Sequence, residues 1–172
     1  MLTPQHRLLL AVASFGLGAY LLVSNDYVGI LCLAASAYFG HSYFRYGTVW
    51  LAYREVAHGR MDAAVKLLGK VKDPAALGSE QRAYYELAWG LVCASRAGAE
   101  NQRAEEHLQS ALSHQLRTDN DRALAEALLA QLLVARDELD QARQLVDKAL
   151  TRQCGPTILA RLKSMKEELQ SS

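Results

Sequence analysis

The sequence predicts an all-α protein with two domains: a transmembrane helical hairpin at residues 1–45 and a helical-repeat domain at residues 46–172. Three observations lead to this prediction. Residues 8–25 and 27–44 are two runs of 18 residues without a charged side chain. Three later stretches resemble one another. The residues around them are rich in Ala, Leu, Gln, Glu, Arg and Lys, which favour helices.

The two uncharged runs predict membrane-spanning helices at about residues 8–24 and 27–45. A helix of 18 residues is roughly 27 Å long, which is close to the ~30 Å thickness of a hydrocarbon core. Asp26 is the only charge between Arg7 and Arg45, and it follows Ser24 and Asn25, which favour tight turns. We therefore expect Asp26 at the water-exposed tip of a hairpin. A re-entrant hairpin is the alternative.

The flanking charges predict the orientation of this hairpin. Arg7, Arg45, Arg54 and Arg60 lie near its open end, whereas its tip has no Lys or Arg. The positive-inside rule then places both termini and the repeat domain in the cytoplasm, at a bacterial inner membrane. No residue between Tyr27 and His58 except Gly47 breaks a helix, so we expect the second helix to continue into the first repeat.

Small residues four positions apart predict where the two helices approach each other. Ser14 and Gly18 form one such pair, and Ser36 and Gly40 form the other. Small side chains let two helix backbones come close. We expect these four residues to pack the hairpin or to form a homo- or hetero-oligomer through it.

The three similar stretches predict stacked pairs of helices. They align on an alanine that is followed four residues later by Leu or Val: Ala64 with Leu68, Ala104 with Leu108, and Ala142 with Val146. The alanines are 40 and 38 residues apart. A period of about 34–47 residues is typical of helical-repeat proteins. Residues 156–169 have an early proline and apolar residues on one face, which predicts a capping helix.

This pattern resembles the tetratricopeptide repeat. The third copy fits the family best, with first-helix positions at Leu129, Ala130 and Leu133 and second-helix positions at Ala142, Val146 and Ala149. In the second copy the register of the helices is uncertain, because extra residues separate them. The resemblance implies a right-handed α-solenoid of about three helix pairs, and it suggests a membrane-anchored bacterial member of the family.

The resemblance also implies a concave groove that holds a protein or peptide partner. The residues expected to line this groove are Tyr53, Tyr85, Trp89, Arg96 and Gln131. Aromatic residues dominate packing energies wherever they are buried, so the alternative is that these side chains only fill the space between repeats.

Charges, cysteines and motifs narrow the possible functions. Lys and Arg total 19 against 18 for Asp and Glu, so there is no basic excess that would bind nucleic acid. The cysteines Cys32, Cys93 and Cys154 are far apart, which favours free thiols. The histidines form no metal-binding motif, and no phosphate-binding loop or nucleophile elbow occurs. We expect no enzyme activity, no cofactor and no metal.

The leading interpretation is a membrane-anchored scaffold or adaptor whose repeats bind a protein or peptide partner at the cytoplasmic membrane face. Its expected partners are that protein and the lipid bilayer, without nucleic acid. The first alternative is a structural subunit of a larger membrane complex that assembles mainly through the hairpin. The second is an enzyme whose site the sequence does not reveal.

Overall fold

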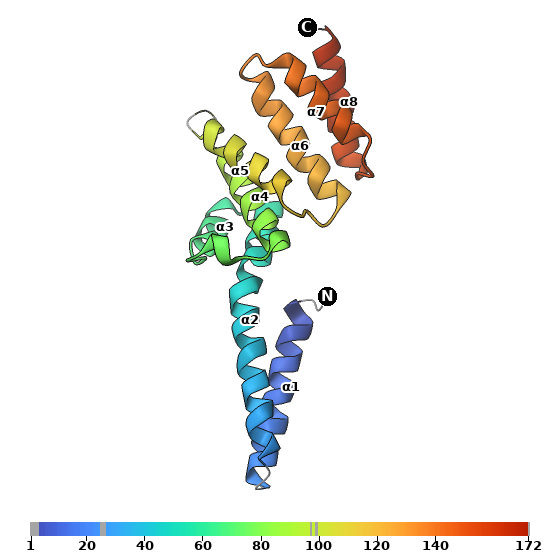
Figure 1. Cartoon of the computed structure of the whole chain (residues 1–172). Coiled ribbons are helices and arrows are strands. Elements are labelled where there is room, and N and C mark those ends of the chain that lie inside the picture. Colours follow the sequence, from blue (N-terminus) through green and yellow to red (C-terminus); the bar gives the residue numbers. More distant parts are fainter. Residues whose placement is uncertain (1–3, 25–26, 97, 99, 172) are drawn as a thin grey trace. The chain divides into compact units, whose positions relative to one another are not determined.

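The computed structural model of the chain describes the backbone of residues 4–24, 27–96, 98 and 100–171, and the side chains of these residues except 4–8, 39–46 and 171. In these ranges the secondary structure is helical throughout, which confirms the all-α class (Figure 1). The helices are α1 (Pro4–Val23), α2 (Val28–Ala57), α3 (Met61–Leu68), the 3₁₀ helix η1 (Pro74–Ala76), α4 (Ser79–Ser95), α5 (Asn101–Ser113), α6 (Asp119–Val134), α7 (Leu139–Leu150) and α8 (Pro156–Ser171).

The chain divides into two compact units. We call Met1–Leu51 the hairpin unit and Ala52–Ser172 the repeat unit. The division falls within α2, which continues as one helix through Gly47 to Ala57. Gly47 therefore does not interrupt α2. The helix continues toward the first repeat, as we expected from the sequence.

The prediction of a transmembrane hairpin is wrong. Among the residues that the structure describes, no helix has the length and apolar character needed to cross a membrane. α1 and α2 form over the two uncharged runs, but neither helix meets this requirement in its described residues.

The predicted location depended on those two spans, so it falls with them. This correction applies to the bacterial inner membrane, to the cytoplasmic side of both termini and the repeat domain, and to the transmembrane description of residues 8–24 and 27–45. The tip residues Asn25 and Asp26, from which the hairpin was inferred, lie outside the described residues.

The repeat unit consists of successive helix pairs, which confirms its repeat-like organisation. The end of α2 precedes α3, α4 pairs with α5, and α6 pairs with α7, before α8 packs on both α6 and α7. The aligned alanines Ala64, Ala104 and Ala142 lie on the second helix of each pair and are fully buried. A methyl group is small enough for two helix backbones to approach closely, so alanine at this position permits the pairing.

Local sequence signals set the helix boundaries in this unit. Thr118 caps α6 by accepting a hydrogen bond from the backbone N–H of Asp121 at 3.0 Å. Gly59 adopts a positive φ of 75°, which glycine tolerates, in the turn between α2 and α3. Pro156 starts α8, where its fixed φ is favourable and its missing N–H costs nothing.

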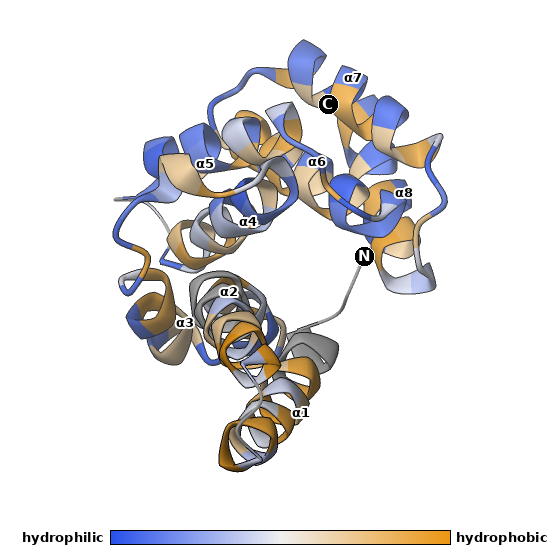
Figure 2. Cartoon of the chain, turned by 60° about the horizontal axis from the view of Figure 1, so that its bottom comes forward, coloured by the Kyte–Doolittle hydropathy of each residue, from blue (hydrophilic) through white to orange (hydrophobic). Residues whose placement is uncertain are grey.

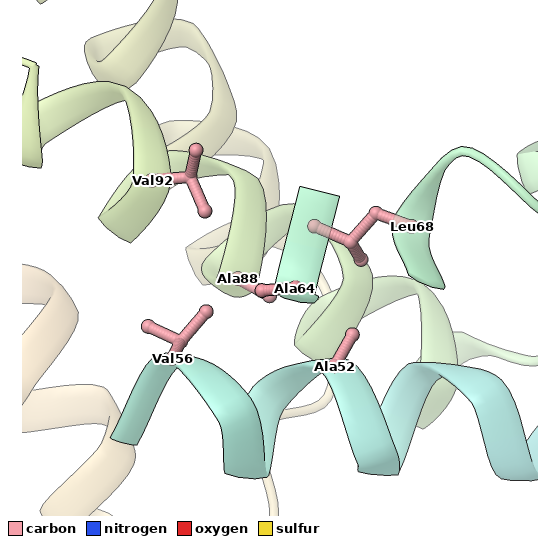
Figure 3. Close-up of a cluster of buried hydrophobic side chains, with 6 residues drawn as sticks. All are labelled: Ala52, Val56, Ala64, Leu68, Ala88 and Val92. Atoms are coloured by element: carbon pink, nitrogen blue, oxygen red, sulfur yellow. The ribbon is translucent and has the colours of Figure 1, made fainter. Parts of the chain in front are cut away.

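The first helix pair and α4 share one apolar cluster. Its buried side chains come from α2, α3 and α4, and they point toward one another in Figure 3: Ala52, Val56, Ala64, Leu68, Ala88 and Val92. Farther along α4, a Cβ added to Gly90 would lie 2.8 Å from Cγ of Leu108. The absence of a side chain at Gly90 thus makes room for α5.

Removal of the Leu108 side chain tests how much this packing stabilises the unit. Leu108 is fully buried, so we expect Leu108→Ala to lower the free energy of unfolding by about 2–5 kcal/mol. Val134 is exposed, and Val134→Ala should change the free energy of unfolding by less than about 0.5 kcal/mol. Urea unfolding of the full chain, followed by circular dichroism, measures both. Equal effects of the two substitutions would contradict the packing described here.

Candidate functional site

The two helices of the hairpin unit approach each other most closely at two glycines. A Cβ on Gly29 would lie 2.7 Å from the carbonyl oxygen of Gly18, and a Cβ on Gly18 would lie 3.0 Å from the carbonyl oxygen of Gly29. Near the other end, the Ser36 hydroxyl donates a 2.8 Å hydrogen bond to the carbonyl oxygen of Ala11. Backbones this close leave no space for larger side chains at the contact.

The predicted packing residues are only partly those that the structure brings together. Gly18 and Ser36 lie in the contact between α1 and α2, and Ser14 is half-buried. The surroundings of Gly40 lie outside the described residues. The sequence pattern did not identify Gly29, because it joins small residues four positions apart in one helix, whereas Gly29 faces Gly18 across the hairpin. Two glycines at similar distances before and after the predicted turn are the signal that indicates this contact.

Large apolar side chains are exposed over most of the described hairpin. Val23 is 89% exposed, Tyr27 85% and Leu31 71%. We call the exposed large side chains of residues 9–38 the apolar hairpin surface: Leu9, Leu10, Val12, Phe15, Leu17, Tyr20, Leu22, Val23, Tyr27, Val28, Ile30, Leu31 and Tyr38. In Figure 2 the orange colour marks the apolar residues along α1 and the first part of α2.

The repeat unit differs sharply in this respect. Among its described residues, Val134 is the one large apolar side chain that is clearly exposed, at 39%. Blue and white residues cover much of its ribbon in Figure 2. Among the described residues, the large exposed apolar surface therefore belongs to the hairpin unit.

Tyr53, the first of the predicted groove residues, belongs to a polar cluster around Asp121. The Tyr53 hydroxyl donates to Oδ1 of Asp121 at 2.5 Å, and the Tyr84 hydroxyl donates to Oδ2 at 2.6 Å. The Thr118 hydroxyl also donates to Oδ2, at 2.7 Å. The rings of Tyr53 and Tyr84 meet edge to face, with centroids 5.1 Å apart. Asp121 thus joins α2, α4 and α6, the first helices of three successive pairs.

Tyr85 and Trp89 lie in a second cluster, on the side of α4 that faces α3 and α5. Both are half-buried and pack against the apolar cluster of Figure 3. The Trp89 ring stacks on the ring of His107 with centroids 6.0 Å apart. His107 Nδ1 lies 2.7 Å from Oε2 of Glu86.

Glu86 is a buried carboxylate that an arginine and a histidine approach. Arg82 Nε donates to Oε1 of Glu86 at 2.6 Å, on the opposite side from His107. Burial by itself would raise the pKa of Glu86, but the hydrogen bond from His107 and the charge of Arg82 outweigh it, so the pKa is lowered. The carboxylate therefore stays ionised and ties α4 to α5.

The two remaining groove residues are also engaged within the chain. Arg96 pairs with Glu100 at 3.3 Å, just after α4. Gln131 accepts a hydrogen bond from Arg161 of α8. Each of the five predicted residues thus has contacts within the chain, and their lining of one groove stays a prediction.

A third buried carboxylate, Glu126, lies between α6 and the end of α7. Arg152 binds both of its oxygens, with Nε at 2.7 Å and Nη2 at 2.8 Å. Lys148 is 3.6 Å away. The hydrogen bonding of Arg152 to Glu126 is the main cause that raises the pKa of Arg152.

The described side chains do not form a recognisable reaction centre. Within those ranges, no three His, Cys, Asp or Glu residues are grouped so that they could hold a metal ion. In the same part of the chain, every buried side-chain nitrogen or oxygen has a hydrogen-bond partner. Burial, together with a hydrogen bond to Glu100, raises the pKa of the Cys93 thiol to about 11, which disfavours the reactive thiolate.

Comparisons with known proteins leave the structure as the basis for assigning function. No protein-family model matches the chain, and neither a curated protein nor a solved structure is detectably similar to it. The resemblance to the tetratricopeptide repeat therefore remains a proposal that rests on the repeated alanines and on the helix pairs.

Loss of the Asp121 carboxylate should be far more damaging than loss of an exposed one. Asp121→Ala removes three hydrogen bonds to a charged group, one of them from the buried Tyr84 hydroxyl, so we expect about 3–5 kcal/mol of destabilisation. Asp147 forms an exposed ion pair with Lys166, and Asp147→Ala should cost less than about 1 kcal/mol. Urea denaturation midpoints measure the difference. A small effect of Asp121→Ala would show that the cluster is not an anchor.

The two tyrosines in this cluster predict a loss of stability in alkali. Burial, and then the hydrogen bond to Asp121, raise the pKa of the Tyr53 and Tyr84 phenols well above their ordinary value. Above about pH 10 the unfolded chain releases these protons while the folded chain keeps them, so stability falls as the pH rises. The double substitution Tyr53→Phe with Tyr84→Phe should reduce this fall between about pH 9 and pH 11. Urea midpoints with an unchanged pH dependence would contradict the assignment.

Proposed function

We propose that this chain is a helical-repeat scaffold that assembles with a protein partner through the apolar hairpin surface. The partner chemistry that fits is an uncharged, apolar helical surface. The repeat unit is then the domain that the hairpin contact holds close to this partner. The single observation that carries the proposal is the concentration of exposed apolar side chains on the hairpin unit, while the repeat unit has a polar exterior.

The area of the apolar hairpin surface supports this proposal. A large apolar or aromatic side chain presents about 150–250 Å² when fully exposed, so the exposed fractions add up to on the order of 1,500 Å². The largest apolar patch of a typical monomer is about 300–600 Å², and larger ones mark interaction sites. A specific interface needs about 800 Å² from each partner. The hairpin offers enough surface for such an interface.

The charge of this surface restricts the partner. Residues 9–24 and 27–38 contain no charged side chain, so a charged partner surface would lose its hydration without gaining an ion pair. An apolar partner surface loses nothing on contact and removes the exposed side chains from water. The match is therefore to an apolar protein surface.

Binding at the repeat unit is the competing location. Tyr85 and Trp89 are the residues there that most resemble interface anchors, since Trp and Tyr are common in binding hot spots. They already pack against the apolar cluster and His107, so a partner would meet only their half-exposed edges. This leaves the hairpin as the better supported contact.

Site-specific photo-crosslinking in cells tests the proposal. A photoreactive amino acid at Leu31 reports on the hairpin, one at Trp89 reports on the repeat unit, and one at Asp147 serves as a control on α7. We expect a crosslinked protein from Leu31 and none from Asp147. A second substitution, Leu17→Lys, should reduce the Leu31 adduct at least about tenfold, because it places a charge in the apolar contact.

A matched control substitution lies in the repeat unit of the same chain. Val134→Lys adds a charge at the exposed apolar residue of the repeat unit and should leave the Leu31 adduct unchanged. Protein adducts from Trp89 alone would move the contact to the repeat unit and contradict the proposal. Lipid adducts without protein adducts from Leu31 would also contradict it.

A further inference from the structure

We infer that the protein surface covering the apolar hairpin surface belongs to a second copy of this chain, so that two hairpins pair into a four-helix bundle. The inference rests on the proposed function, because it names the partner at the same site. It follows from the amount of exposed apolar surface, from its lack of charge and from its placement around the two helices.

The size of the surface favours a second copy over an unrelated protein. Any other partner would need an uncharged apolar patch of comparable area, and patches above a few hundred Å² are rare on folded monomers. A second copy always carries one, at the same concentration as the first. One association then covers a flank of both molecules, roughly half of the exposed apolar area of each, which is close to the ~800 Å² per partner that a specific interface needs.

The lack of charge removes the usual obstacle to self-association. In a two-fold symmetric contact each residue near the axis meets its own equivalent, so a charged residue there would face a like charge. The described hairpin residues, 9–24 and 27–38, include no charged side chain. Two copies can therefore meet along residues 9–24 and 27–38 without like-charge repulsion.

The helical periodicity places apolar side chains on a flank that both helices share. The contact between α1 and α2 runs along Ala11, Gly18 and Ser36. At 100° per residue, Phe15 lies about 60° from Gly18 around α1, and Ile30 lies about 100° from Gly29 around α2. Both side chains are exposed, and they lie on the same flank of the antiparallel pair.

A flank of this kind is the surface through which two antiparallel hairpins form a four-helix bundle. In such a bundle each helix packs against one neighbour within its hairpin and another across the dimer. The opposite flank carries Leu17 and Leu31, which are also exposed. The bundle therefore has two possible contact flanks, and substitutions can tell them apart.

Sedimentation equilibrium of the purified full chain in aqueous buffer tests the inference. We expect a dimer at micromolar concentration. Phe15→Lys on one flank and Leu17→Lys on the other each place a charge on the apolar hairpin surface. The substitution on the contact flank should weaken the dimer at least about tenfold, since an unpaired charge would be buried. Val134→Lys is the matched control and should leave the dimer intact, with circular dichroism confirming that every variant is folded.

The remaining outcomes separate this inference from the proposed function. A monomer at all concentrations, or a dimer that neither Phe15→Lys nor Leu17→Lys weakens, would overturn the inference. If crosslinking from Leu31 in cells still captured another protein in that case, the proposed function would survive. Flotation with phosphatidylcholine vesicles as a monomer would identify lipid as the covering surface and would overturn both.

Discussion

The close approach of helix backbones at alanine and glycine is the constraint on which this structure depends. In the repeat unit, Ala64, Ala104 and Ala142 occupy the same position in the second helix of each pair, and each is fully buried. Gly90 makes the equivalent room for α5, and Gly18 with Gly29 do so in the hairpin. Dispersion forces act over short distances, so helices that pack this closely gain contacts along their whole length. A larger side chain at any of these positions would separate the pair.

Buried carboxylates complement this packing by joining helices that are distant in sequence. Asp121 accepts hydrogen bonds from Tyr53 and Tyr84, which lie 68 and 37 residues before it. Glu126 binds Arg152, and Glu86 binds His107. Apolar packing tolerates small shifts between helices, whereas a buried charge tolerates few, because any shift leaves it without a partner. Alanines bring the helices together, and these carboxylates determine how they are aligned.

The sequence predicted the local features of the fold well and the long-range ones poorly. The repeated alanines and the helix boundaries at Gly59, Thr118 and Pro156 depend on neighbouring residues, so they could be recognised directly. The role of Tyr53 could not, because its partner Asp121 is in another repeat and no periodicity connects them. The partner of Gln131 on α8 was missed for the same reason, and the placement of Tyr53 and Gln131 in a groove stays a prediction. The transmembrane prediction failed for another reason: it rested on the absence of charge, whereas no described helix combines the length and the apolar character that a membrane span needs.

The contrast between the two units has an energetic consequence for the whole chain. Covering about 800 Å² of apolar surface is worth roughly 20 kcal/mol at about 25 cal/mol per Å². Association costs about 4–15 kcal/mol in lost freedom of motion, so a well-matched contact of this size leaves a net gain. The repeat unit has no comparable exposed apolar surface to remove from water, because its apolar side chains are already covered. Its described buried polar groups all have partners. The assembly that we propose would therefore be driven by the hairpin, while the repeat unit already has its described buried polar groups paired and its core covered.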